Sequence, residues 1–186
     1  MYASPSAIDQ NCILTGYLGP AQLVVARRVA ERLRLGFVDF QTELERRAGV
    51  DEEELRLRFG EARLKTLENE IVGDLALYRG TLIHVSGGAL CRNGYFEMLS
   101  ATGTVICLVA ALDTVLQRLH LALGARYHDP RERAQALGVV RREWAVRERV
   151  DPRDVIDTSA LDEAQIVERV SMHWRERAAV LDWRAV

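Results

Sequence analysis

The sequence predicts an α/β protein in which helices cover both faces of a five-stranded parallel sheet, a three-layer α/β/α arrangement. Short apolar runs typical of buried strands lie at residues 12–15, 37–39, 81–85, 104–109 and 155–157. Segments with helical periodicity separate these runs, and this alternation is typical of parallel strands joined by crossover helices. With 186 residues, 48% of them apolar, the chain can close one core. We therefore expect a flexible arm over residues 1–10 and a single domain over residues 11–186.

Glycines and a capping aspartate show where the first three helices begin or end. An amphipathic helix follows the first strand and ends at Gly36, and a second helix over residues 41–48 ends at Gly49. Asp51 then caps a third helix, with acidic residues in its first turn that favour the positive end of the helix dipole. Gly60 interrupts this helix, so the sequence predicts a break there.

The last third of the chain predicts a lid and two long helices. A helix begins at Asp113, and residues 124–132 lack periodicity, so we expect them to form a mobile lid. A charged helix is expected over residues 131–150. The final helix, over residues 162–183, begins with Asp162 and Gln165 in the spacing of a capping box. In a parallel sheet of this kind, any site is expected at the carboxyl ends of the strands.

Composition excludes several classes of function. The net charge is -2 and the basic residues are scattered among acids, so no nucleic-acid partner is expected. No apolar run approaches the ~20 residues needed to cross a bilayer, and residues 1–10 do not resemble a signal peptide. Cys12, Cys91 and Cys107 are far apart and are expected to be free thiols. We therefore expect a cytoplasmic protein that does not interact with membranes.

The turn after the first strand has the outline of a phosphate-binding loop. Such loops follow the pattern G-x-x-x-x-G-K-[ST], in which backbone N–H groups surround phosphates, the lysine adds charge and the hydroxyl binds Mg²⁺. The remnant of the pattern consists of Gly16, Gly19, Pro20, Ala21, Gln22 and Leu23. Ala21 replaces the second fixed glycine, Gln22 the lysine and Leu23 the hydroxyl residue. The loop is therefore expected to bind triphosphate poorly.

Several longer motifs resemble shikimate kinases. FVDFQTELERRAG, FGEARLKTLENEI, SGGAL, VICLVAALDTVLQRL and VIDTS occur in the order and spacing of that family, over about residues 11–170. The ending VIDTSALDEAQIVERV is also similar to cytidylate kinases, which share the nucleoside-monophosphate-kinase fold. The resemblance implies P-loop kinase topology, an ATP and Mg²⁺ requirement, and phosphoryl transfer to a hydroxyl group of a small acid.

The resemblance implies roles for several residues on the substrate side. Asp39 matches an aspartate that helps to hold Mg²⁺, and Gln41 stands where the family has the aspartate that binds the substrate and takes its hydroxyl proton. An amide cannot accept that proton at neutral pH. Lys65 stands where an arginine pairs with the substrate carboxylate, and it lacks the bidentate fork. Gly87 and Gly88 match the family's substrate-binding glycine loop, in which Ser86 replaces the first glycine.

Three arginines complete the implied site. Arg126 matches a lid arginine that closes over the phosphates, and Arg118 matches one that stacks on adenine. Arg142 matches a second arginine for the substrate carboxylate, with Arg147 nearly as well spaced.

Each of these residues also has a structural interpretation that stays open. Asp39 can act as a helix cap, Gly87 and Gly88 can form a tight strand-to-helix turn, and Lys65 can be a solvated surface residue. His84 is interpreted as a core histidine with satisfied partners. These interpretations require no catalysis.

Three functional hypotheses follow. In the first, the protein is a shikimate kinase-like protein that is impaired or inactive in phosphoryl transfer. It binds a small ligand or a partner in the cleft that corresponds to the active site of the family, and no cofactor is expected. In the second, it is an active small-molecule kinase with an atypical loop, which requires ATP and Mg²⁺. In the third, it is a scaffold or a homodimer that pairs through the C-terminal helix, where Trp174 and Leu181 lie on one stripe.

Overall fold

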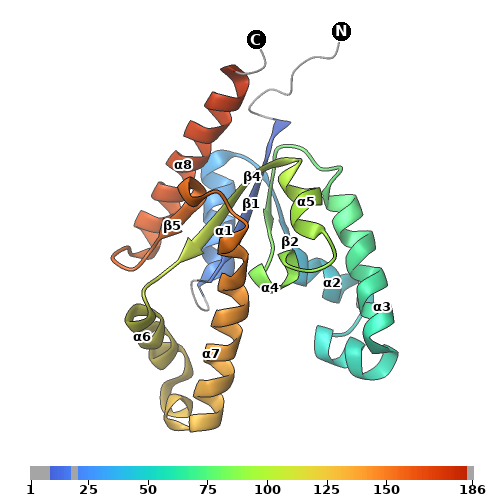
Figure 1. The fold of residues 1–186 in the computed structure, drawn as a ribbon, viewed down its shortest axis with the longest axis vertical. Coiled ribbons are helices and arrows are strands. Elements are labelled where there is room, and N and C mark those ends of the chain that lie inside the picture. Colours follow the sequence, from blue (N-terminus) through green and yellow to red (C-terminus); the bar gives the residue numbers. More distant parts are fainter. Residues whose placement is uncertain (1–8, 18–20, 184–186) are drawn as a thin grey trace.

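The computed structural model describes residues 9–17 and 21–183, and for residues 180–183 the backbone only. Its centre is one five-stranded sheet in which every neighbouring pair of strands is parallel, in the order β2-β3-β1-β4-β5 (Figure 1). The strands are β1 (Asn11–Gly16), β2 (Gly36–Asp39), β3 (Thr81–His84), β4 (Gly103–Val109) and β5 (Val155–Asp157). The predicted α/β class and five-stranded parallel sheet are confirmed.

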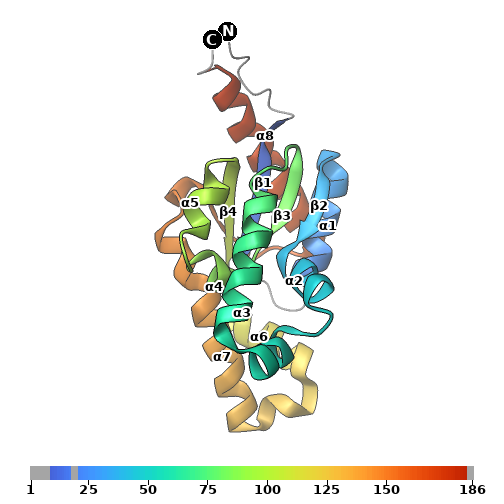
Figure 2. The same ribbon diagram turned by 90° about the vertical axis from the view of Figure 1, so that its right-hand side faces the viewer.

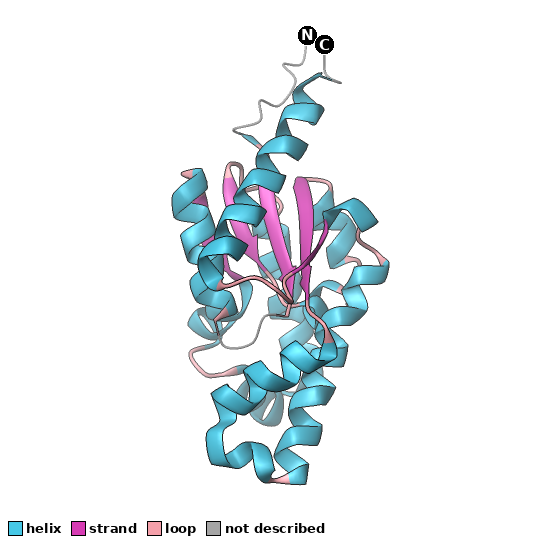
Figure 3. Ribbon diagram, turned by 90° about the vertical axis from the view of Figure 1, so that its left-hand side faces the viewer, coloured by secondary structure: helices cyan, strands magenta, loops and turns pink. Residues whose placement is uncertain are grey.

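Two layers of helices cover the sheet. The helices are α1 (Gln22–Leu33), α2 (Phe40–Ala48), α3 (Glu52–Leu75), α4 (Gly87–Leu90), α5 (Tyr95–Ser100), α6 (Leu112–Leu123), α7 (Pro130–Trp144) and α8 (Glu163–Trp183). Figure 2 shows α3 in front of one face of the sheet, and Figure 3 shows α8 in front of the other. The helices α6 and α7 extend beyond the carboxyl ends of the strands (Figure 1).

The alternation of side chains along β1 explains the two layers. Successive residues of a strand point to opposite faces of the sheet. Ile13 joins the core formed with α2, α3 and α5, whereas Cys12 and Leu14 join the core formed with α1 and α8. Because both faces are buried, the middle of the strand, Cys12 to Leu14, is continuously apolar instead of alternating with polar residues.

Glycine makes the predicted break in α3. Gly60 has φ 79° and ψ 169°, a region that only glycine adopts readily, and it separates two helical segments that meet at a kink. The capping box is also present, because Asp162 N donates to Gln165 Oε1 at 2.9 Å and Gln165 N donates to Asp162 Oδ1 at 2.8 Å. These local signals were therefore sufficient to place both features.

Two boundaries differ from the expectation. Residues 124–128 form a 3₁₀ turn, and α7 begins at Pro130, where the carboxylate of Asp129 accepts from Arg131 N. The segment expected as a lid over residues 124–132 is thus a 3₁₀ turn followed by the first turn of α7, which starts one residue before the expected position 131. The helix expected to reach residue 150 ends at Trp144, because a tighter turn brings Val146 into the core, where it is fully buried.

The C-terminal helix packs against its own chain. Trp174 is 6% exposed and belongs to the core between α1, α8 and the sheet. The side chain of Leu181 lies outside the described residues. One of the two residues considered for a dimer contact is thus engaged within the chain. No helix of the described residues is long and apolar enough to cross a membrane.

Candidate functional site

The phosphate-loop remnant begins at a glycine that the sheet requires. Gly16 has φ 101°, and an added Cβ would lie 2.1 Å from the carbonyl oxygen of Leu108. The next residue, Tyr17, donates its backbone N–H to that same oxygen at 3.0 Å. Gly16 is therefore needed for the close approach of β1 and β4, whatever the loop binds. Gly19 and Pro20 lie outside the described residues.

Gln22 closes the remnant on itself. Its side-chain Nε2 donates to the carbonyl oxygen of Gly16 at 2.9 Å, so an amide links the two ends of the loop. Ala21 provides no side-chain cap for α1, and Leu23 lies half-buried in the first turn. These positions offer neither a cation nor a hydroxyl. The side chains at 21–23 therefore do not fit a magnesium-bound triphosphate.

Both carboxylate oxygens of Asp39 are hydrogen-bonded to other residues of the chain. Its Oδ1 accepts from Thr42 N at 2.8 Å and from Thr42 Oγ1 at 2.6 Å, which caps α2. Its Oδ2 lies 2.6 Å from His84 Nδ1, and because a carboxylate only accepts, this histidine nitrogen carries the proton. Burial alone would raise the pKa of Asp39, but these hydrogen bonds outweigh it and lower the pKa.

His84 is a buried histidine with one partner. Nδ1 is bonded to Asp39, while Nε2 is buried and has no hydrogen-bond partner in the part of the chain that the structure describes. The described residues also contain no group of three or more histidine, cysteine, aspartate or glutamate side chains that could hold a metal ion. The expectation that the ring nitrogens of His84 have hydrogen-bond partners is thus correct for Nδ1 but not for Nε2.

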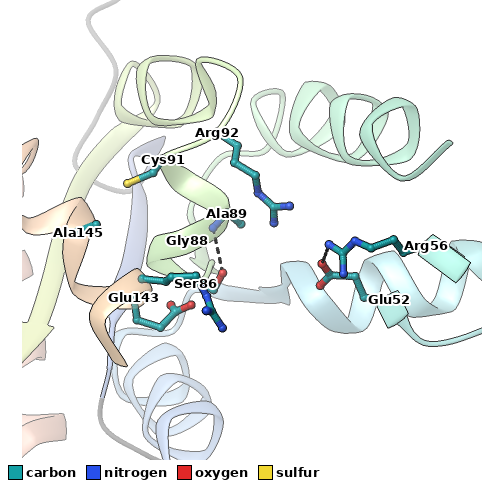
Figure 4. A pocket seen from close by; sticks show the side chains of 10 residues that line it. Glu52, Arg56, Ser86, Gly88, Ala89, Cys91, Arg92, Glu143 and Ala145 are labelled. Carbon is teal, nitrogen blue, oxygen red and sulfur yellow. Dashed lines mark hydrogen bonds and ion pairs between the residues drawn. The ribbon is translucent and has the colours of Figure 1, made fainter. Parts of the chain in front are cut away.

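A cavity of about 670 Å³ lies at the carboxyl end of β3 (Figure 4). It is lined by Glu52, Arg56, Ser86, Gly88, Ala89, Cys91, Arg92, Arg142, Glu143 and Ala145. The residues come from α3, from α4 with the turns before and after it, and from α7 with the turn after it. Three of them are arginines, two are glutamates and one is a serine. The lining is thus suited to a small polar molecule that carries an anionic group.

Glu143 uses the backbone donors of the glycine turn. Its Oε2 accepts from Gly87 N at 2.6 Å, and an added Cβ on Gly87 would lie 1.9 Å from the carbonyl oxygen of Glu143. Burial raises the pKa of Glu143, although the backbone N–H groups of Gly87 and Gly88 oppose this change. Gly87 therefore holds α7 against α4, and its N–H group is already bonded to a carboxylate of the chain.

Arg92 is held by a buried acid on α3. Its Nη2 lies 3.0 Å from Oε1 of Glu68, which is only 2% exposed. Burial raises the pKa of Glu68, and the charge of Arg92 acts in the opposite direction. Removing a carboxylate from water requires a compensating cation, so this pair fixes the guanidinium at the cavity wall. Sequence reasoning did not identify Arg92 or Glu68.

A second cavity, of about 510 Å³, lies beside the start of α1. Its lining includes Ala21, Val25, Leu161 and Ile166, and Arg118 forms one side. Two hydrogen bonds hold Arg118 to Thr158, at 2.9 Å to the carbonyl oxygen and 3.2 Å to Oγ1. Burial lowers the pKa of Arg118. Asp162 and Glu163 also line the cavity, but most of its lining is apolar and one side is a fixed guanidinium, which suits an aromatic ring.

Comparison with known proteins identifies the family. A family model described as shikimate kinase matches residues 24–173, most of the chain. This chain belongs to the shikimate kinase family. Among its relatives, shikimate kinase from Thermodesulfovibrio yellowstonii is 26% identical over 87% of this chain and 92% of that protein. Shikimate kinase from Histophilus somni is 30% identical over 73% of this chain and 79% of that protein.

A solved structure shares the fold. Shikimate kinase from Bacteroides thetaiotaomicron superposes with a TM-score of 0.71 at 21% identity, covering 90% of this chain and 96% of that one. The P-loop kinase topology expected from the sequence is therefore confirmed. The family match begins at residue 24, directly after the loop remnant.

The structure brings some of the family positions together and separates others. Gly88 and Arg142 line the larger cavity, whereas the exposed Arg147 is not among its lining residues. Lys65 is exposed on α3 and does not line this cavity. Gln41 is also absent from the lining and donates to Glu45 instead. The shikimate kinase positions thus converge only in part.

The lid arginine is engaged at the surface. Arg126 lies on the 3₁₀ turn at residues 124–128, and its Nη2 is 2.7 Å from Oε2 of Glu132. Both side chains are substantially exposed, so this ion pair contributes little to stability and can be broken at small cost. This contact uses one guanidinium nitrogen, so Arg126 can still donate to an anion, either beside Glu132 or after leaving it.

Proposed function

We propose that this shikimate kinase-family protein binds a small hydroxylated acid in the larger cavity and is impaired in ATP-dependent phosphoryl transfer. One observation carries the proposal: the residue at the lysine position, Gln22, is an uncharged amide bonded to the loop's own Gly16 carbonyl. A phosphate at this position would have no lysine to pair with, and the amide of Gln22 would occupy part of its site. The cavity on the other side keeps a polar, arginine-rich lining.

The size of the loss supports an effect on turnover. Each charge-assisted hydrogen bond at a buried phosphate contributes ~1.5–3 kcal/mol. Groups that stabilise transition-state charge each contribute about 10²–10³ in rate when they are removed singly. The lysine and the hydroxyl ligand of Mg²⁺ are both replaced, by Gln22 and Leu23. Even partial additivity would bring turnover close to background.

Calorimetry with ATP, with and without Mg²⁺, tests the proposal. We expect no binding at micromolar concentrations, and no phosphoryl transfer to shikimate in a coupled assay that detects far less than the ~1–100 s⁻¹ of ordinary kinases. Micromolar, Mg²⁺-dependent binding of ATP, or turnover within that range, would contradict it.

A restored loop provides the matched comparison. The triple variant Ala21→Gly, Gln22→Lys and Leu23→Ser should bind ATP more tightly than the wild type by about tenfold or more, because it regains charge and a metal ligand. Ala21→Gly alone serves as the control, since it changes the backbone but adds no charge. No gain in the triple variant would mean that the path of the loop itself excludes phosphate.

An active kinase with an atypical loop is the second candidate. The apolar cavity beside Arg118 favours it, because an adenine ring fits such a surface. In that case ATP and Mg²⁺ would be required, and Arg126 would supply charge after leaving Glu132. The same calorimetry separates the two candidates, since only the second predicts Mg²⁺-dependent nucleotide binding.

A further inference from the structure

We propose that Arg92 receives the carboxylate of the ligand, in the role that family resemblance gives to Lys65. This inference rests on the proposed binding of a small hydroxylated acid and names the residue that selects its charge. The geometry that supports it is the position of Arg92 at the cavity wall, braced from behind by the buried Glu68.

Lys65 does not line the cavity. It lies at the edge of the buried stripe of α3, three residues before Glu68 and seven before Val72. Its side chain is nevertheless exposed, and it is not among the lining residues, whereas Arg92 is. The cations at the cavity wall therefore include Arg92 but not Lys65.

Arg92 faces the cavity from the turn after α4. Figure 4 shows its side chain extending into the space between α4 and the segment that carries Glu52 and Arg56. Guanidinium offers five N–H donors, and the contact with Glu68 uses Nη2. The side chain is 37% exposed, so its remaining terminal N–H groups can donate to a ligand oxygen.

The brace makes Arg92 a preorganised group. Glu68 is almost fully buried, so its carboxylate stays behind the cavity wall and its ion pair favours the position of the guanidinium seen in the structure. A side chain that is already ordered loses less conformational entropy when it binds a carboxylate. Lys65, which is exposed, has no such restraint from burial.

The remaining lining groups define the rest of the ligand. Arg142 from α7 adds a second cation, and Ser86 adds a hydroxyl. The carboxylate of Glu143 accepts backbone N–H groups of the glycine turn, and its remaining lone pairs can accept from a ligand hydroxyl. A ligand carboxylate at Arg92 would pair with the cations of the lining, and ligand hydroxyl groups near Glu143 would donate to its carboxylate. The ligand class is therefore a small polyhydroxylated monocarboxylic acid.

Calorimetry with shikimate and its methyl ester tests the inference. The ester keeps the ring and its hydroxyl groups but has no anionic group. We expect the wild type to bind shikimate at least tenfold more tightly than the ester. In the double variant Arg92→Gln and Glu68→Gln, which leaves no buried charge unpaired, this ratio should fall to near one. In Lys65→Gln, the matched control on the same helix, it should stay at the wild-type value.

The outcomes are distinct from those of the proposed function. A ratio that survives in the double variant, or that is lost in Lys65→Gln, overturns the inference while leaving ligand binding in place. A wild type that does not prefer the acid over the ester also overturns it. If circular dichroism shows that the double variant is unfolded, Arg92→Lys replaces it, because it keeps the charge beside Glu68 and loses the fork. The ratio should then fall by several-fold, and an unchanged ratio refutes the role of Arg92.

Discussion

Replacing Gly87 by alanine should lower the free energy of unfolding by about 2 kcal/mol, within the ~1–3 kcal/mol range of overpacked sites. The added Cβ would lie 1.9 Å from the carbonyl oxygen of Glu143, whereas ordinary contact begins at 3.4 Å. Helices α4 and α7 would have to separate by about 1.5 Å, the difference of these two distances. The 2.6 Å bond from Gly87 N to Glu143 would then lengthen or break.

Gly88→Ala is the matched control for this prediction. The nearest atom to its added Cβ is Glu143 Oε1 at 3.4 Å, the end of a side chain that can adjust. Alanine also has a higher helix propensity than glycine, by ~0.5–1 kcal/mol. Its stability should therefore stay within ~0.5 kcal/mol of the wild type or rise slightly.

Urea unfolding followed by circular dichroism measures both variants. The midpoint should fall for Gly87→Ala with an unchanged slope, because the surface exposed on unfolding is the same. Equal midpoints for the two variants would refute the reasoning, since the close approach at Gly87 would then not exist in solution. A large loss in Gly88→Ala would equally contradict it.

Two further predictions concern charge and reactivity. Burial favours the neutral form of Asp39, but hydrogen bonds from His84 and Thr42 lower its pKa overall. Its carboxylate therefore stabilises the folded state above the unfolded pKa of ~3.9, and this stabilisation is lost as pH falls below that value. The stability difference between wild type and Asp39→Asn should accordingly shrink from pH 6 to pH 3 in urea titrations, and a constant difference would exclude this linkage. Burial raises the pKa of the Cys107 thiol to about 12 and that of Cys12 further, whereas Cys91 is exposed. A thiol reagent should therefore modify one cysteine in the native protein and three after denaturation, and rapid native modification of a second thiol would disprove the burial.

The architecture was predictable because apolar runs, glycines and helix caps determine the backbone conformation of the few residues around them. The apolar runs at 12–15 and 104–109 are buried on both sides, which only a covered parallel sheet provides. Gly60 and the Asp162 capping box determine backbone geometry within a few residues. The start of α7 at Pro130 lies within one residue of the expected start at 131, but the expected end at residue 150 was wrong. The helix ends at Trp144 because the turn that buries Val146 depends on tertiary packing.

The site was less predictable because it depends on pairs that are distant in sequence. The sequence showed that Gln22 had replaced a lysine, but not that its amide would reach back to Gly16. Position in a motif suggested Lys65, whereas its side chain is exposed and does not line the cavity. A buried glutamate in an otherwise apolar stripe, Glu68, was the available signal for Arg92. Such a residue requires a cationic partner, but its identity depends on tertiary structure.

The kink in α3 sets the direction of one wall of the larger cavity. Glu52 and Arg56 stand on the eight residues before Gly60, where the helix changes direction. This short segment is anchored by Leu55, which is buried in the core, and by the ion pair of Arg56 with Glu61 across the kink. Without a glycine at position 60 these two side chains would continue along the axis of the helix that carries Glu68, so the width of the cavity depends on one backbone conformation.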